Sequence, residues 1–327
     1  MKINTSHGSG GKATSDLIRS VFAKHFSNKI LDCMEDSAVV DSSAKIAITT
    51  DSFVITPIFF KGGDIGKLSI VGTVNDLLMR GAVPKYITCG FIIEEGTDFE
   101  TLDKIAQSMS KTAKEANVLI VAGDTKVIEG NGGVYINTAG VGFVENEIEV
   151  ASCKCENDDV IILSGTLGDH HATVLSSRLN IENDIQSDCA PLNEMVLGLI
   201  QNSIRVKAMR DVTRGGLATI LNEIFDASKC GIEIFEDAIP VSSQVRGLCD
   251  ILGLDPLYMG NEGKFVVVVN AKDAKKALSL LKSSKYGENA SIIGKMSSVQ
   301  NNVVLKTSIG GKRIIEELFG EGLPRIC

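Results

Sequence analysis

Five aspartates stand at or beside the end of an apolar segment of this sequence. They are Asp36 in MEDSAV, Asp51 in ITTDSF, Asp76 in TVNDLL, Asp124 in VAGDTK and Asp211 in MRDVTRGG. A strand that ends at such a position delivers a side chain to a sheet edge, so several of these carboxylates can converge. Magnesium held between a protein and nucleotide phosphates requires oxygen ligands of this kind. Taken singly, each aspartate is more simply explained as a helix cap or a turn residue.

A glycine-rich segment, HGSGGK at residues 7–12, contains Gly8, Gly10, Gly11 and Lys12. Its backbone N–H groups and its lysine have the composition of a loop that wraps a phosphate. The Walker A spacing GxxxxGK[ST] fails, because Ala13 follows Lys12 and no strand precedes the segment. A flexible leader is the alternative explanation.

Two further loops carry groups that could do acid–base chemistry. MGNEGKF, at 259–265, places Glu262 and Lys264 before the apolar run FVVVV. This position suits a partly buried acid with a shifted pKa, and equally an ordinary solvated turn. SGTLGDHH, at 164–171, predicts a strand-to-helix turn with Asp169 as the N-cap, and it does not match GxGxxG.

Eight cysteines, at positions 33, 89, 153, 155, 189, 230, 249 and 327, form no CxxC pair. In a chain of this size they are expected to be reduced thiols. Cys153 and Cys155 predict a turn at a domain boundary, because a lone CxC falls short of a zinc site. Cys327 ends the segment GEGLPRIC, in which glycines and a proline predict a flexible arm that carries the thiol.

The elements that must position these residues alternate along the chain. We expect strands at 45–55, 85–95, 118–125, 132–144, 160–165, 231–236 and 264–270, followed by two short strands. We expect helices at 65–81, at 98–117 with Asp98 as N-cap, and at 169–179, 190–201, 217–228, 242–253 and 271–284, with MRDVTRGG as a loop. The pattern is that of an α/β or α+β protein.

Length and composition place the chain among globular proteins of two domains. The 327 residues are 44% hydrophobic and 23% charged, which supplies ample core. The polar stretch at 145–159 predicts the boundary, giving domains at 1–152 and 153–309 and a flexible tail at 310–327. The net charge of −8, without a basic block, argues against nucleic acid and anionic membrane surfaces as partners. Because no apolar run is long enough for a membrane or a leader, we expect a cytoplasmic protein.

Taken together, the motifs resemble one family over nearly the whole chain and in the right order. HGSGGK, TTDS, NDL, AGDTK, SGTLGDHHAT, RDVTRGG, NEGK and LPRIC are similar to the HypE family of hydrogenase maturation proteins. That family belongs to the wider group of aminoimidazole ribonucleotide synthetase and selenophosphate synthetase. Most of the motifs are shared with the wider group, whereas the PRIC ending, Thr125 and Lys126 follow the narrower family. The resemblance implies a two-domain α/β fold with nucleotide in the cleft, whose N-terminal domain forms the sheet of a homodimer.

The activity implied by the resemblance is that of a carbamoyl dehydratase. A partner carbamoyltransferase, HypF, would load a carbamoyl group onto Cys327, and the chain would dehydrate it with ATP to a protein thiocyanate. The cyano group would pass to iron held by a HypC–HypD complex and become a cyanide ligand of [NiFe]-hydrogenase. Removing water from such a carboxamide requires phosphorylation of its oxygen and a base for the protons on its nitrogen.

The resemblance also implies roles for individual residues. Cys327 would be the carrier, Glu262 the base, and Lys126 the group that orients the amide. Nucleotide would be bound by Gly8, Gly10, Gly11, Lys12, Asp51, Asp76 and Asp124. Magnesium ions (Mg2+) would be held by Asp36, Asp51, Asp76 and Asp211. His170 is a further candidate, and His171 is unassigned because the family has glycine there.

Two other functions remain open from the sequence. The chain resembles, more distantly, other ATP-dependent synthetases of the same group, although selenophosphate chemistry would favour a cysteine in HGSGGK, which has none. A synthetase acting on a free small molecule would not need a tail thiol. A non-catalytic adaptor with a partner-binding tail would turn over no ATP, and its binding would survive Glu262→Ala.

Overall fold

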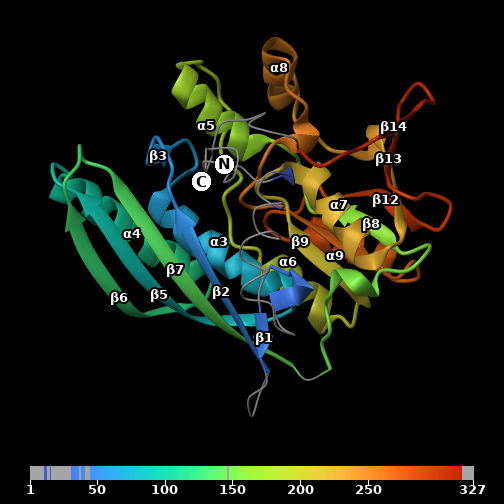
Figure 1. Ribbon diagram of the computed structural model, residues 1–327, viewed down its shortest axis with the longest axis horizontal. Helices are drawn as coiled ribbons and strands as arrows, with labels where there is room; N and C mark the ends of the chain where they lie inside the picture. Colours follow the sequence, from blue (N-terminus) through green and yellow to red (C-terminus); the bar gives the residue numbers. More distant parts are fainter. Residues whose placement is uncertain are drawn as a thin grey trace.

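The computed structural model describes residues 45–145 and 147–318, and nearer the N-terminus residues 11, 12, 15, 31–36 and 38–40. These residues form two large sheets that lie side by side, each with helices packed on it, and one two-stranded sheet (Figure 1). The expected α/β class is therefore confirmed.

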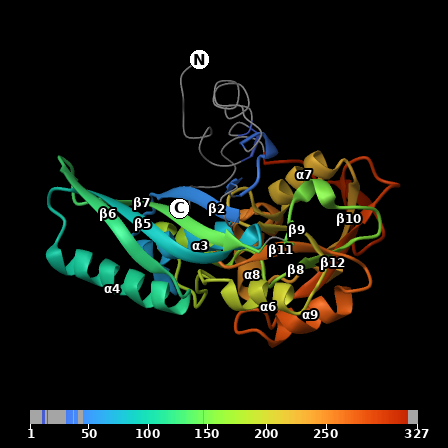
Figure 2. The ribbon, with the colours of Figure 1, turned by 90° about the horizontal axis from the view of Figure 1, so that it is seen from below.

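The first sheet has the strand order β1-β2-β7-β5-β6. Its strands are β1 (Ala38–Val40), β2 (Lys45–Phe53), β5 (Val83–Glu94), β6 (Leu119–Ile128) and β7 (Val134–Val144). All neighbours are antiparallel except β5 and β6, which run parallel. Helices α3 (Ile65–Met79) and α4 (Phe99–Glu115) pack on one face, and α4 is seen along it in Figure 2.

Helix α3 is the central element of the molecule. Nearly all of its side chains are buried, because it lies between the first sheet and elements of the second half, which it contacts at β9 and α6. A helix that is apolar all round is expected to be enclosed in this way. Its start is fixed by Asp64, whose carboxylate accepts hydrogen bonds from the N–H groups of Gly66 and Lys67 at 2.7 and 3.0 Å. A two-stranded hairpin, β3 (Phe59–Phe60) and β4 (Gly63–Asp64), leads into it.

The second sheet has the order β14-β13-β10-β12-β8-β11-β9. Its strands are β8 (Val160–Leu163), β9 (Val206–Asp211), β10 (Gly231–Phe235), β11 (Phe265–Val269), β12 (Ser291–Ser297), β13 (Val303–Lys306) and β14 (Lys312–Ile314). Helix α7 (Gly216–Ser228) contacts β9, β10 and β13, whereas α9 (Ala274–Ser283) contacts β8 and β12 and packs on α6 (Asn193–Gln201).

Strand β11 shows why the sheet needs helices on both faces. Phe265, Val267 and Val269 belong to the core shared with α3, α6 and α9, while Val266 and Val268 belong to the core under α7. A strand buried on both sides has a continuous apolar sequence, which explains the run FVVVV.

The remaining elements are short or peripheral. They are α5 (Asp169–Leu179), α8 (Ser243–Leu252) and the 3-10 helices η3 (Leu31–Cys33), η4 (Ser152–Lys154), η5 (Glu236–Ala238) and η6 (Pro256–Tyr258). None of the described helices combines the length and the apolar character that crossing a membrane requires. The η4 helix lies within the polar stretch expected to join the domains, whose limits stay a prediction.

The loop predicted for MRDVTRGG is wrong in its first half. Met209, Arg210 and Asp211 end β9, which pairs antiparallel with β11. The charged residues Arg210 and Asp211 hid the strand in the sequence, because charged residues seldom occupy buried strands. Here they are buried in ion pairs and in a carboxylate cluster. Only Val212 to Gly215 form the loop before α7.

The predicted start of the flexible tail, at residue 310, is too early. Gly310 and Gly311 form the turn of a hairpin, in which the Thr307 N–H donates to Gly311, and β14 then pairs with β13. Ile315 is 1% exposed, and the carbonyl of Glu316 accepts a hydrogen bond from the Tyr258 hydroxyl at 3.1 Å. The glycines therefore serve a turn at this point.

Candidate active site

Five carboxylates meet where the first half of the chain packs on the second. Asp51 comes from the α3-facing side of β2, Asp76 from α3, Asp211 from the end of β9 and Glu262 from the loop before β11, with Asp36 from the segment after η3. The charges of Asp36, Asp51 and Asp211 act on Asp76, and those of Asp51 and Asp211 act on Glu262. The structure thus brings together four of the five aspartates singled out in the sequence, and the predicted base.

Burial and mutual repulsion raise the pKa values of this group. Burial raises the pKa of Asp76 well above its ordinary value, and the charges of Asp211, Asp51 and Asp36 raise it further. Burial likewise raises the pKa of Glu262 strongly, with added repulsion from Asp211 and Asp51. For Asp211, burial raises the pKa to about 6 although Arg210 opposes the shift. Binding of a cation would relieve this repulsion, although among the described residues no three such side chains are already grouped so that they could hold a metal ion.

Arg210 holds the segment of Asp36 against β9. Its Nε lies 2.8 Å from Asp36 Oδ2, and the guanidinium also pairs with Glu223 and, at 3.6 Å, with Glu35. It donates to the carbonyl of Met34 at 3.2 Å. Asp211 follows Arg210 directly in the sequence. Because Arg210 is almost fully buried, its ion pairs fix the position of Asp36 relative to Asp211.

The Asp76 carboxylate is oriented from β2. Thr49 donates its hydroxyl to Asp76 Oδ2 at 2.8 Å and approaches the carbonyl of Asp36 at 3.4 Å. Asp51 lies on the same strand, and burial raises its pKa although the charge of Arg214 opposes the shift.

The loop of Glu262 is tightly enclosed. The N–H of Glu262 donates to Asp188 Oδ1 at 3.0 Å, and its carbonyl accepts from Asn75 Nδ2 at 3.3 Å. Lys264 Nζ lies 3.7 Å from Asp188 Oδ2. At Gly263, a Cβ would overlap the carbonyl oxygen of Asp188, so the loop can lie here only with glycine at this position.

Asp124 and Lys126 lie elsewhere, on the exposed edge strand β6. They pair with one another at 2.6 Å, and their side chains are 70% and 67% exposed. The hydrogen bond from Lys126 lowers the pKa of Asp124. Within the described chain the structure does not bring either residue to the buried carboxylates.

The end of the glycine-rich segment contacts the start of the C-terminal residues. Gly11 has a φ of +81°, and a Cβ there would overlap the carbonyl oxygen of Leu318. The N–H of Lys12 donates to the same carbonyl at 2.9 Å. Gly8, Gly10 and Cys327, which were also predicted site residues, lie outside the described residues.

The two histidines of α5 are both buried. His170 Nδ1 lies 2.7 Å from the Ser187 hydroxyl, and its ring stands edge-on to Phe60. Burial lowers the pKa of His171 to about 3, so its neutral Nδ1 can accept from the N–H of Gly260, 3.4 Å away. His171 therefore joins α5 to the loop that precedes Glu262.

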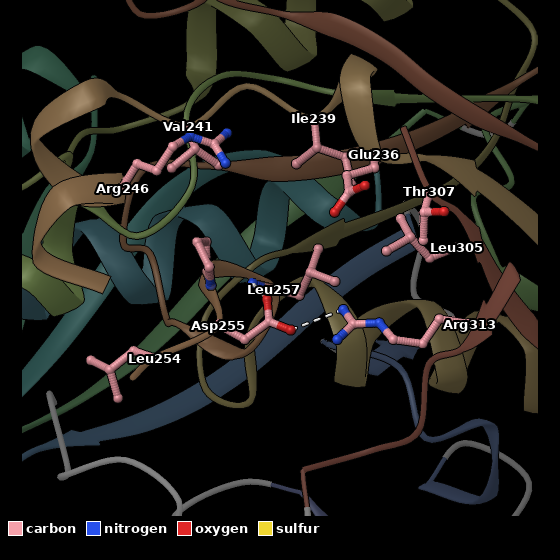
Figure 3. Close-up of a pocket in the computed structure, with 11 residues that line it drawn as sticks. Glu236, Ile239, Val241, Arg246, Leu254, Asp255, Leu257, Leu305, Thr307 and Arg313 are labelled. Carbon is pink, nitrogen blue, oxygen red and sulfur yellow. Dashed lines mark hydrogen bonds and ion pairs between the residues drawn. The ribbon is translucent and has the colours of Figure 1, made fainter. Parts of the chain in front are cut away.

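A separate cavity of about 420 Å³ lies in the second half, between α8, η6 and the β13–β14 hairpin (Figure 3). Leu257 and Leu305 contribute apolar wall, and Arg313 pairs with Asp255 at 2.9 Å on its rim. None of the predicted site residues that the structure describes lines it.

The sequence interpretation missed Asn75, Asp188 and Arg210. A signal for Asn75 was present, because it is a polar residue enclosed in the apolar helix IGKLSIVGTVNDLLM. Asp188 lies in a polar loop between α5 and α6 and had no comparable signal. Arg210 was hidden in the segment taken for a loop.

Comparisons with known proteins cover both halves of the chain. The families described as AIR synthase related protein, N-terminal domain and C-terminal domain, match residues 34–144 and 156–306. The carbamoyl dehydratase HypE of Escherichia coli (strain K12) is 44% identical over 99% of this chain and 99% of its own length. A chain in the crystal structure of a HypE–HypF complex matches with a TM-score of 0.88 at 45% identity, over 92% of this chain and 99% of that chain. A crystal structure of HypE in complex with ATP matches with a TM-score of 0.84 at 42% identity, over 100% of both chains.

Proposed function

Because the chain belongs to the family of the carbamoyl dehydratase HypE, we propose that it dehydrates a carbamoyl group on its own Cys327 with ATP. The product is a protein thiocyanate, the cyanide donor in the maturation of [NiFe]-hydrogenase. The observation that carries the proposal is the junction of the two halves, where the charges of Asp51 and Asp211 act on both the buried Glu262 and Asp76.

The reaction balances as a dehydration driven by ATP. The Cys327 sulfur carries the carboxamide through its carbon. The oxygen of this carboxamide takes the γ-phosphoryl group of ATP, and ADP leaves. Two protons are then removed from the nitrogen while the carbon–oxygen bond breaks, leaving a thiocyanate and inorganic phosphate. The protein must therefore bind phosphates, hold the tail and accept protons.

Glu262 is the proposed proton acceptor. Its raised pKa means that, once ionised, it is a stronger base than an exposed carboxylate. Its loop is closed by Asn75, Asp188 and the contact at Gly263, so the carboxylate is held on a rigid support.

We assign nucleotide binding to the glycine-rich segment with Lys12 and to Asp51 and Asp76. Asp124, exposed on β6, would join them from a second copy of the chain. The repulsion among Asp36, Asp51, Asp76 and Asp211 fits a divalent cation, and we propose these four residues as ligands of Mg2+. When bound, magnesium would neutralise charge on the phosphates.

Lys126 is proposed to reach the site of a second copy. The face of the first sheet away from α3 and α4 is apolar and exposed, with Ile48, Tyr86 and Phe143 on it. Such a face supports the predicted homodimer. Since Lys126 lies on the exposed strand β6 and Glu262 lies in the junction, pairing of two copies accounts for how both would flank one thiol.

The proposed partners follow the reaction sequence. HypF, which forms a complex with a related HypE, would load the carbamoyl group, and an iron-carrying HypC–HypD complex would take the cyano group. A cytoplasmic location remains part of the proposal.

Intact-mass analysis tests the function directly. The chain is incubated with HypF, a carbamoyl donor and ATP, and we expect Cys327 to gain a carbamoyl group and then lose the mass of one water. The Cys327→Ala variant should gain and lose nothing. Equal behaviour of wild type and variant would contradict the proposal, and tail-dependent partner binding without ATP turnover would favour an adaptor.

A further inference from the structure

The backbone of Glu262 is fixed by two side chains from distant parts of the chain. Asp188 accepts from its N–H at 3.0 Å, and Asn75 donates to its carbonyl at 3.3 Å. Neither of these two bonds belongs to a sheet ladder or a helix. The placement of Glu262 along this loop therefore depends on where Asn75 and Asp188 lie.

The hydrogen bonds of the Asn75 side chain all cross the junction between the halves. Its Nδ2 donates to the carbonyls of Glu262 and, at 3.2 Å, of Ala190, and its Oδ1 accepts from the N–H of Leu192 at 3.0 Å. The side chain is 2% exposed, so water cannot replace these bonds without opening the junction. An asparagine enclosed in a central helix is thus used entirely for bonding to the second half.

Asn75 is also the direct neighbour of Asp76. Residue 76 belongs to the carboxylate cluster, where it is oriented by Thr49 and repelled by Asp211. One turn of α3 therefore carries a cluster carboxylate on one side and the support of Glu262 on another. A shift of this turn would move both together, because a helix is rigid over such a length.

We propose that Asn75 is a positioning residue that sets the Glu262 carboxylate relative to the nucleotide site; this inference rests on the proposed dehydratase function. In this role Asn75 acts through the loop of Glu262, to which its side chain is bonded. Asn75 holds the loop of Glu262 in a fixed position relative to the turn of α3 that carries Asp76. Loss of the Asn75 side chain therefore impairs proton removal and leaves nucleotide affinity intact. A displacement of about 1 Å of a catalytic group lowers a rate by about a hundredfold.

The test compares full-length Asn75→Ala and Asn75→Ser with wild type. ATP affinity is measured by titration calorimetry, and water loss is followed by mass in a single turnover of chain previously carbamoylated by HypF. We expect the rate of water loss to fall about ten- to a hundredfold, with the Kd for ATP changed less than about twofold. Melting temperatures are recorded, and rates are measured well below them. The polar Ser variant is used if the Ala variant does not fold.

Asn193→Ala is the matched control. Asn193 also bonds across the halves, donating Nδ2 to the carbonyl of Ala116 at 3.0 Å, but it starts α6 and its side chain makes no hydrogen bond to the Glu262 loop. Its rate should stay near that of wild type. Equal losses in Asn75→Ala and Asn193→Ala, a parallel loss of ATP affinity, or an unchanged rate would overturn the inference. Absence of water loss in wild type would instead refute the proposed function.

Discussion

At the scale of single residues, the site is defined by carboxyl groups that resist ionisation. Asp36, Asp76 and Glu262 have pKa values raised well above the ordinary range, with burial as the largest cause in each case. Such groups cost stability in the folded chain whenever they are charged without a counter-ion. The same cost is what binding of a cation would relieve.

For Asp211, the cost of charging a buried carboxyl group can be measured from the pH dependence of the free energy of unfolding. Its pKa is raised to about 6, so between pH 4 and 6 the folded chain keeps a proton that the unfolded chain releases. Its contribution to the free energy of unfolding therefore falls as pH rises through this window, and stays low above it. Measured by chemical denaturation without divalent cations, Asp211→Asn should gain about 2–3 kcal/mol relative to wild type between pH 4 and pH 7. A difference between the two proteins that does not change with pH would contradict this expectation.

At the scale of elements, the loop between η6 and β11 is shaped by close contacts more than by its own sequence. Gly263 passes so near the loop of Asp188 and Ala190 that no side chain fits. The sequence placed Glu262 correctly before a strand, because FVVVV has the pattern of a buried strand. It could not show that the loop is clamped, since the clamping residues lie far away in the chain.

Gly263→Ala should displace this loop. The added Cβ forces the loop away from Asp188, so the rate of water loss is expected to fall about ten- to a hundredfold. Gly247→Ala is the control, because nothing lies within 4 Å of a Cβ there and alanine in the middle of α8 should stabilise the helix by about 0.5–1 kcal/mol. The prediction fails if the Gly263 variant dehydrates its carbamoyl group as fast as the Gly247 variant.

At the scale of the whole molecule, the predicted catalytic side chains of Glu262 and Lys126 lie in different environments. Glu262 is 4% exposed at the junction, whereas Lys126 projects from the edge of the first sheet. A homodimer that covers the apolar face of this sheet would reconcile the two. The active site would then combine residues of both copies.

Mixed dimers test this arrangement. Lys126→Ala and Glu262→Ala should each be inactive, but after subunit exchange a mixed dimer would hold one complete site. Random mixing should restore about a quarter of the wild-type rate of water loss. The background is measured by mixing the double variant, which carries both substitutions, with either single variant. If exchange is verified by mass and no activity returns, Lys126 does not act across the dimer.

The sequence by itself determined the α/β pattern, most of the helices and strands, and the residues of the carboxylate cluster. Local sequence was sufficient for elements such as β2, α3 and β11, because a strand rich in β-branched residues, a long apolar helix and a continuous apolar run are visible in the residues themselves. Tertiary structure alone decided that β9 is a strand, that Asp124 and Lys126 lie apart from the cluster, and that Asn75 supports Glu262. The physical reason is distance along the chain: Asn75 and Glu262 are 187 positions apart, and no local pattern records a bond formed only when two sheets pack.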